Sequence, residues 1–155
     1  MVAYSFNKGF VDPIASGRKR QTIRAPRRRH AQIGEQLQLY TGMRTKACRL
    51  IRDDVVCVGL GEVRFDLRPL ADLPEPGSAR ELARLLAERP VSLEVNGIPI
   101  ETEFDQDEFA AADGFDNWRL GRTELSPFEA MVNFWMVTHG AGLFTGVLIS
   151  WEPVR

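Results

Sequence analysis

Helix-start signals occur three times in this chain of 155 residues, and all three lie after residue 77. Each consists of a capping residue and a glutamate three positions later: Ser78 with Glu81, Asp105 with Glu108, and Ser126 with Glu129. Such a pair predicts a helix because the two side chains satisfy backbone N–H groups that the first turn leaves unpaired. We therefore expect a helix directly after each cap, the first ending before Pro90 because proline interrupts a helix.

The part of the chain before these signals favours strands. Residues 2–6 and 37–40 alternate between apolar and polar side chains, as a half-buried strand does, and a helical turn is expected around residues 11–15. Residues 48–51 and 55–58 flank the polar run 52–54, which predicts a hairpin turn there, and the extended segment then continues to residue 67.

Two further strand signals lie after the first of these helix starts. Asn96-Gly97 separates two short apolar segments and is a strong hairpin signal, because both residues tolerate a positive φ. Residues 143–151 predict a closing strand. About six or seven strands with three or four helices indicate an α+β fold built around a curled sheet or small barrel.

Length and hydropathy favour one cytoplasmic domain. The 155 residues fall within the ~100–200 of a typical domain, and 44% of them are apolar, which is enough for a core. No apolar run approaches the ~18 residues that suggest a membrane span. The first residues, Met-Val-Ala-Tyr-Ser-Phe-Asn-Lys, lack the apolar core of a signal peptide. We therefore expect a cytoplasmic protein without a membrane partner.

The formal net charge of −1 is the sum of a strongly basic first part and an acidic remainder of the chain. Residues 1–52 contain 12 Lys and Arg against two acidic residues, whereas the remainder contains eight against 19. Arginine outnumbers lysine 17 to three. A guanidinium can bind phosphate through two parallel hydrogen bonds. This division favours an anionic partner that carries phosphate, although the two halves could instead neutralise each other in the fold.

Metal and cofactor sites have no support in the sequence. Cys48 and Cys57 stand nine positions apart, with no Cys-x-x-Cys pair and no paired histidines nearby. This spacing is not that of a zinc site, and it indicates reduced structural thiols. We expect neither a metal nor a cofactor.

The segment Gly17-Arg18-Lys19-Arg20-Gln21-Thr22-Ile23-Arg24 contains the main candidate site. If residues 21–24 are extended, Thr22 and Arg24 point to one face and Ile23 to the other. A hydroxyl and a guanidinium would then share a surface, with Lys19 at a turn just before them. This grouping is suited to binding an oxyanion or phosphate. The alternative is that the segment is a solvated charged loop without a ligand.

Other candidate binding residues surround this segment. Tyr40 leads into a basic loop in which a base could stack on the ring while a cation meets phosphate, or Tyr40 could pack in the core. Asp113-Gly114-Phe115 could simply end the helix before it. The candidate nucleic-acid-binding residues are Arg18, Arg20, Arg24, Arg27, Arg28, Arg29, Tyr40, Arg44 and Lys46.

The motif Gly17-x-Lys19-x-x-Thr22-Ile23-Arg24, followed by Gly34-Glu35-x-Leu37 and then Asp113-Gly114-Phe115, resembles the ASCH family of the PUA-like superfamily. The resemblance covers most of the chain, from about residue 6 to 151. It implies a small, mostly antiparallel β-barrel with three or four peripheral helices and a cleft for RNA or a nucleoside. The whole chain, 1–155, would be one such domain, with residues 68–103 as a helix-plus-hairpin insertion.

The resemblance also implies two kinds of activity. Some ASCH proteins bind nucleic acid, and ribonuclease activity has been proposed for some of them. Others are amidohydrolases that deacetylate N-acetylated cytidine with a lysine, a threonine and a glutamate. Lys19 and Thr22 match the first two, as base and nucleophile, and Asp113 is the best match for the third, although it is one methylene shorter.

We therefore expect an RNA- or nucleotide-binding domain with a basic cleft, with or without hydrolysis of the RNA. An amidohydrolase that acts on an N-acylated cytidine-type nucleoside is the first alternative. A protein-interaction domain whose basic face meets an acidic partner is the second.

Overall fold

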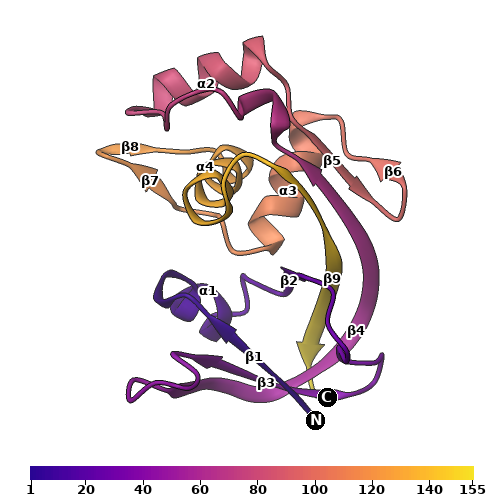
Figure 1. The fold of residues 1–155 in the computed structure, drawn as a ribbon. Helices are drawn as coiled ribbons and strands as arrows, with labels where there is room; N and C mark the ends of the chain where they lie inside the picture. The colour runs from indigo at the N-terminus through magenta and orange to yellow at the C-terminus, as the bar shows by residue number, and fades with distance from the viewer. The chain divides into compact units, whose positions relative to one another are not determined.

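The computed structural model describes all 155 residues, which form two compact units. Unit 1 comprises residues 1–61, 112–114 and 147–155, and unit 2 comprises residues 62–111 and 115–146. The α+β class is confirmed, because the chain forms a seven-stranded mixed sheet, a two-stranded sheet and four α-helices. Strands β4 (Arg49–Asp66) and β9 (Leu143–Pro153) each contribute residues to both units (Figure 1).

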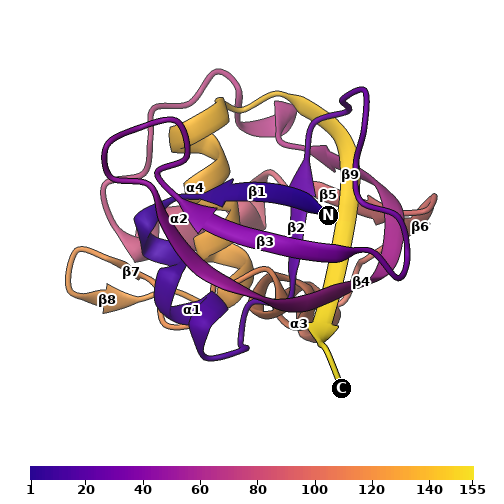
Figure 2. The same ribbon diagram turned by 90° about the horizontal axis from the view of Figure 1, so that it is seen from below.

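Unit 1 contains the strands that were expected near the start of the chain. Strand β1 (Val2–Phe6) pairs in parallel with β3 (Gln36–Thr41), and β3 pairs antiparallel with the first half of β4 (Figure 2). Strand β2 (Gln21–Arg24) pairs antiparallel with β9. A short 3-10 helix, η1 (Lys8–Phe10), and α1 (Val11–Ala15) follow β1, which confirms the expected helical turn.

The expected hairpin at residues 52–54 is wrong, because β4 runs without a turn from residue 49 to residue 66. Arg52 and Asp54 stand two positions apart on one face of the strand, and the guanidinium donates to both carboxylate oxygens, at 2.7 and 2.9 Å. The ladder between β3 and β4 shifts register on either side of Leu39, which pairs with Arg52. The polar run is thus accommodated by an irregular ladder and an ion pair instead of a turn.

The strand pairings form a branched sheet and do not close into a ring. One path runs β1-β3-β4-β5-β6, and β9 pairs with both β4 and β2. The structure therefore has the expected α+β class and four α-helices, with a mixed sheet in which no closed barrel is formed.

Unit 2 confirms two of the three helix starts. The Ser78 hydroxyl accepts from the Glu81 backbone at 3.1 Å and begins α2 (Ala79–Glu88). Ser126 and Glu129 form a complete capping box at the start of α4 (Pro127–His139). Helices α2 and α4 contact each other within this unit (Figure 1). The shared feature is a serine whose hydroxyl replaces a missing backbone acceptor.

The third helix begins earlier than the sequence indicates. Helix α3 (Glu103–Ala112) contains Asp105 in its first turn, and the Thr102 hydroxyl accepts from the Asp105 backbone N–H at 3.1 Å. Thr102 therefore has the capping position that was assigned to Asp105, because either side chain can accept a hydrogen bond from the first turn.

The hairpins and the remaining elements complete unit 2. Asn96 and Gly97 have φ angles of 53° and 76° between β5 (Ser92–Val95) and β6 (Ile98–Pro99), which confirms the expected hairpin. The hairpin of β7 (Arg119–Leu120) and β8 (Thr123–Glu124) was not expected. The segment 68–103, which includes η2 (Arg68–Leu70), lies entirely in unit 2. None of the helices has the length and apolar character that a membrane crossing requires.

Candidate functional site

The Lys-Thr-Arg segment is held in unit 1 by backbone hydrogen bonds at its start. The Lys19 N–H donates to the carbonyl of Pro13 in α1, and the Arg20 N–H donates to the carbonyl of Ala112, both at 2.9 Å. The Arg20 carbonyl accepts from Trp151 of β9, also at 2.9 Å. These bonds bring the end of α3, helix α1 and the start of β2 to one place, so residues distant in sequence become neighbours.

Lys19 and Asp113 form a buried ion pair within unit 1. The Lys19 Nζ lies 2.9 Å from Asp113 Oδ1 and also donates to the Asp113 backbone carbonyl. The two residues are only 2% and 4% exposed. Burial lowers the pKa of Lys19 and raises that of Asp113, and their mutual attraction opposes both shifts. Each group is thereby pushed toward its neutral form.

Gly114 makes this close approach possible. Its φ of +94° lies in the region that favours glycine. A Cβ at this position would lie 2.8 Å from Lys19 Cδ and 3.0 Å from Phe10 Cδ1. The lysine stem and the Phe10 ring therefore fill the space that any other side chain at position 114 would need.

Thr22 and Arg24 share one face of β2, as expected from strand geometry. The Arg24 Nε donates to Thr22 Oγ1 at 3.2 Å, and Arg24 Nη2 donates to the Ser5 carbonyl at 2.7 Å. Ile23, between them, is buried on the opposite face. Arg24 is thus fixed by two hydrogen bonds, and one of them engages the hydroxyl of Thr22.

The ring of Phe6 links the two cations. Lys19 Nζ lies 5.5 Å and Arg24 Cζ 4.6 Å from its centroid, distances at which a cation is attracted to an aromatic face. Burial lowers the pKa of Arg24, and the charge of Asp113 partly offsets this. The buried residues Lys19, Thr22 and Asp113 therefore form one polar cluster with the half-buried Arg24, which we call the Lys19 cluster.

The Lys19 cluster contains the groups needed for acyl or phosphoryl chemistry: a hydroxyl, an amine with a lowered pKa, a carboxylate and a guanidinium. An amine whose charged form is disfavoured by burial acts as a base more readily than an exposed lysine. The guanidinium suits a developing negative charge. In this structure the ammonium of Lys19 is bonded to Asp113, while the Thr22 hydroxyl accepts from Arg24.

The arginine run at residues 27–29 is only partly available to an external anion. Arg27 Cζ lies 4.6 Å from the Tyr4 ring centroid, and Arg27 Nε donates to the Arg29 carbonyl. Arg29 is paired with Glu35. Arg28 is exposed. Two of the three guanidinium groups thus have partners within the fold.

The remaining candidates are dispersed over unit 1. Arg18 and Arg20 are exposed beside the Lys19 cluster, and Tyr40 is half-buried in β3. Arg44 and Lys46 lie in the exposed loop after β3, where Arg44 has a φ of 65°. The structure therefore groups the three residues implied as catalytic with Arg24, and it leaves Tyr40 in β3 and Arg44 and Lys46 in the loop that follows.

Sequence reasoning missed the aromatic surroundings of the cluster. The Tyr4 ring lies 5.4 Å from Arg24 Cζ, and the Phe10 ring lies 4.5 Å from Lys19 Nζ. The alternation of residues 2–6 places Tyr4 and Phe6 on one buried face, which is a usable signal. Nothing in the sequence shows that the cations would lie against that face.

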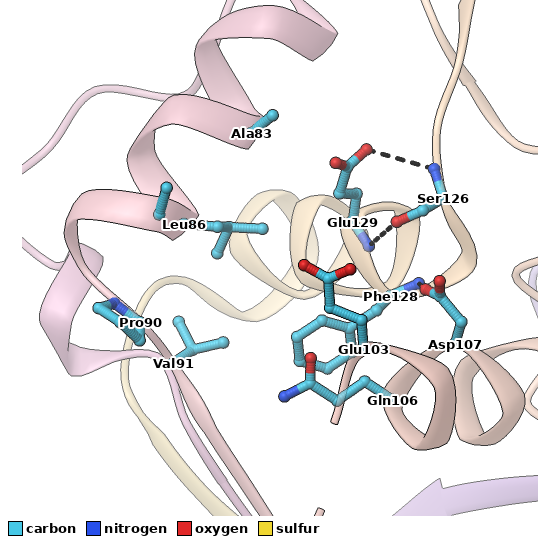
Figure 3. Close-up of a pocket in the computed structure, with 11 residues that line it drawn as sticks. Ala83, Leu86, Pro90, Val91, Glu103, Gln106, Asp107, Ser126, Phe128 and Glu129 are labelled. Atoms are coloured by element: carbon cyan, nitrogen blue, oxygen red, sulfur yellow. Dashed lines mark hydrogen bonds between the residues drawn. The ribbon is translucent and has the colours of Figure 1, made fainter. Parts of the chain in front are cut away.

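Unit 2 contains a hollow of about 370 Å³ with acidic and apolar walls (Figure 3). Two of the carboxylates that line it accept hydrogen bonds from backbone N–H groups at the start of α4. Asp107 Oδ1 accepts from the Phe128 N–H at 3.0 Å, and Glu129 Oε2 accepts from the Ser126 N–H at 3.2 Å. The described residues contain no group of three or more His, Cys, Asp and Glu side chains that could hold a metal ion.

Comparison of the chain with protein-family models, curated proteins and solved structures gives no match.

Proposed function

We propose that this protein is an ASCH-type amidohydrolase that removes an acyl group from the exocyclic nitrogen of a cytidine-type nucleoside. The observation that carries the proposal is the buried Lys19–Asp113 pair with Thr22 and Arg24 in the same cluster. Strongly perturbed pKa values at clustered polar groups are typical of sites that perform chemistry. The motif resemblance, which includes Lys19 and Thr22, supplies the substrate class.

The shorter acid at position 113 is compatible with this activity. Replacement of glutamate by aspartate removes one methylene of reach, yet Asp113 meets Lys19 Nζ at 2.9 Å. Gly114 allows the backbone at this point to approach the lysine, and the Asp113 carbonyl provides a second acceptor. The close backbone approach thus offsets the missing methylene.

The proposed reaction begins with attack of Thr22 Oγ on the acyl carbon, while the hydroxyl proton passes to the neutral amine of Lys19. Lys19 acts in its neutral form, which its burial favours, and Asp113 orients the amine. The C–N bond then breaks, and Lys19 returns its proton to the leaving nitrogen of the nucleoside. Water hydrolyses the threonine ester, which releases the carboxylic acid and restores Thr22. Arg24 stabilises the oxyanion that develops at the acyl carbonyl.

Turnover of N4-acetylcytidine, followed by chromatography of the released cytidine, tests the proposal. Thr22→Val removes the nucleophile at nearly constant volume and should abolish turnover, and Lys19→Met should do the same. Arg80→Gln, at an exposed arginine of α2, is the matched control and should leave turnover unchanged. Turnover that survives Thr22→Val in a folded protein contradicts the assigned nucleophile, and absence of turnover by the wild-type protein contradicts the activity.

A second candidate function is binding of single-stranded RNA. It is favoured by the charge of unit 1, which contains 13 Lys and Arg residues against six Asp and Glu residues. Such binding depends on exposed cations, and its affinity should fall linearly with the logarithm of the salt concentration. Replacement of Arg27, Arg28 and Arg29 together should weaken it for any sequence. No affinity for single-stranded RNA at low salt would exclude this function.

A further inference from the structure

Unit 1 has a hollow of about 580 Å³ that lies apart from the described contacts of the Lys19 cluster. It is formed by η1 and α1, by the end of β3, and by the loop that leads into β4. Its volume falls in the range of ~300–1,000 Å³ that is typical of small-molecule sites. None of the residues that line it belongs to the Lys19 cluster.

Three cations line this hollow, and no carboxylate does. Lys8 comes from η1, Lys46 from the loop and Arg49 from the start of β4. All three side chains are exposed, and none has a described hydrogen bond or ion pair. No acidic side chain of the fold therefore pairs with these three cations, which favours an anion in the hollow.

The rest of the wall is aliphatic. Val11 and Ile51 are half-buried, and Leu50 is 48% exposed. Burial of such surface by a ligand contributes about 25 cal/mol per Å². The hollow contains no aromatic ring on which a base could stack. The wall thus fits an aliphatic chain better than a nucleobase.

The loop that positions Lys46 is internally braced. The Thr45 hydroxyl donates to the Gly42 carbonyl at 2.6 Å and accepts from the Ala47 N–H at 3.1 Å. Gly42 has a φ of +64°, and a Cβ there would lie 2.8 Å from the Ala47 carbonyl oxygen. A preformed loop reduces the entropy that a ligand must offset on binding.

We propose that this hollow binds a small amphiphilic anion: an aliphatic chain with a carboxylate or phosphate head. The head group is held by Lys8, Lys46 and Arg49, and the chain packs on Val11, Leu50 and Ile51. The site is independent of the amidohydrolase chemistry, because it shares no residue with the Lys19 cluster.

Titration calorimetry with decanoate, below its micelle concentration, tests this proposal. Inorganic phosphate carries the charge alone, 1-decanol carries the chain alone, and polyuridylate carries phosphates without an aliphatic chain. We expect decanoate or decyl phosphate to bind at one site, and each isolated part to bind at least about tenfold more weakly. Preferred binding of polyuridylate in competition with decanoate, or no binding of either amphiphile, overturns the proposal.

Substitutions locate the site. Each of Lys8→Gln, Lys46→Gln and Arg49→Gln should weaken decanoate binding about two- to fivefold, as expected for a solvent-exposed ion pair. Arg28→Gln removes an equal charge outside the hollow and should have no effect. Leu50→Ser should weaken binding, whereas Leu60→Ser changes a similarly exposed leucine of β4 outside the hollow and should not. Equal effects of a variant and its control would overturn the assignment.

Cys48 provides an independent readout of position. It is exposed and lies between Ala47 and Arg49, both of which line the hollow, whereas Cys57 is buried. Decanoate should slow alkylation of Cys48 by the neutral reagent N-ethylmaleimide. An unchanged rate at saturating decanoate would place the bound ligand elsewhere and overturn the proposal.

Discussion

Lys19 and Asp113 stand 94 positions apart in the sequence, yet their side chains meet at 2.9 Å in a nearly solvent-free environment. Two opposite charges in such a place are costly to desolvate, and each depends on the other for compensation. The pair therefore matters both for the stability of unit 1 and for the proposed chemistry.

Removal of one partner should destabilise the protein strongly. We expect Asp113→Asn to cost about 3–5 kcal/mol, because it leaves the Lys19 ammonium buried without a counter-charge. Lys19→Met should also destabilise, and the double variant should cost less than the sum of the two. Urea unfolding monitored by circular dichroism measures all three. Strict additivity would show that the two side chains do not interact.

Gly114→Ala should destabilise more than an alanine substitution at a comparable glycine. Both Gly114 and Gly121 have positive φ angles, of 94° and 62°, so alanine is strained at either position, at a cost of roughly 1–2 kcal/mol. Only at Gly114 would the added Cβ also meet Lys19 and Phe10, since nothing lies within 4 Å at Gly121. Equal losses of unfolding free energy in the two variants would contradict the close packing.

The sequence predicts the site in part, because a strand of known direction places Thr22 and Arg24 on one face. It does not predict which residues from other parts of the chain contact that face. The hydroxyl of Thr22 faces a guanidinium that the Ser5 carbonyl holds in place, and this arrangement requires the packing of β1 near β2. Local periodicity has no information on such long-range neighbours.

The errors in the expected fold have a similar origin. The run Arg52-Asp53-Asp54 has the composition of a turn, but pairing with β3 and the Arg52–Asp54 ion pair stabilise an extended strand. Tertiary pairing thus overrides a local turn preference. The expected Asp105 cap is wrong for a different reason, because Thr102 also has a capping oxygen and lies three residues earlier in the same segment.

The proposed amidohydrolase activity should rise with pH. Lys19 acts as a base only when neutral, and burial lowers its pKa below the usual 10.5. The neutral fraction of Lys19 therefore increases as pH rises through that lowered pKa. The rise of kcat/KM with pH should accordingly occur below pH 10.5. A profile of kcat/KM for N4-acetylcytidine between pH 5 and about 10 measures it. A rate independent of pH would contradict a lysine base.

Acid should remove a contribution to stability that comes from Asp66 in unit 2. Arg68 donates to both carboxylate oxygens of Asp66, at 2.9 and 2.8 Å, and lowers the pKa of Asp66 to about 2. A carboxyl with a depressed pKa stabilises the fold above its unfolded value of 3.8, and this stability is lost as pH falls toward about 2.

Asp66→Asn should therefore flatten the decrease of unfolding free energy between pH 4 and about 2. Arg68→Gln should flatten it similarly, because it removes the partner. Urea unfolding at a series of pH values gives the comparison. An acid limb as steep in Asp66→Asn as in the wild-type protein would show that other carboxyl groups cause it.

The pairing of β2 with β9 has a consequence for biosynthesis. Gln21 is opposite Ser150 in this ladder, so the strand that bears Thr22 cannot complete its pairing until residue 150 has left the ribosome. Until then, Thr22 and Arg24 remain in a nascent chain whose edge is unprotected. A ribosome-stalled product that lacks residues 143–155 would leave β2 without its partner strand. We expect chaperones to bind such an incomplete chain.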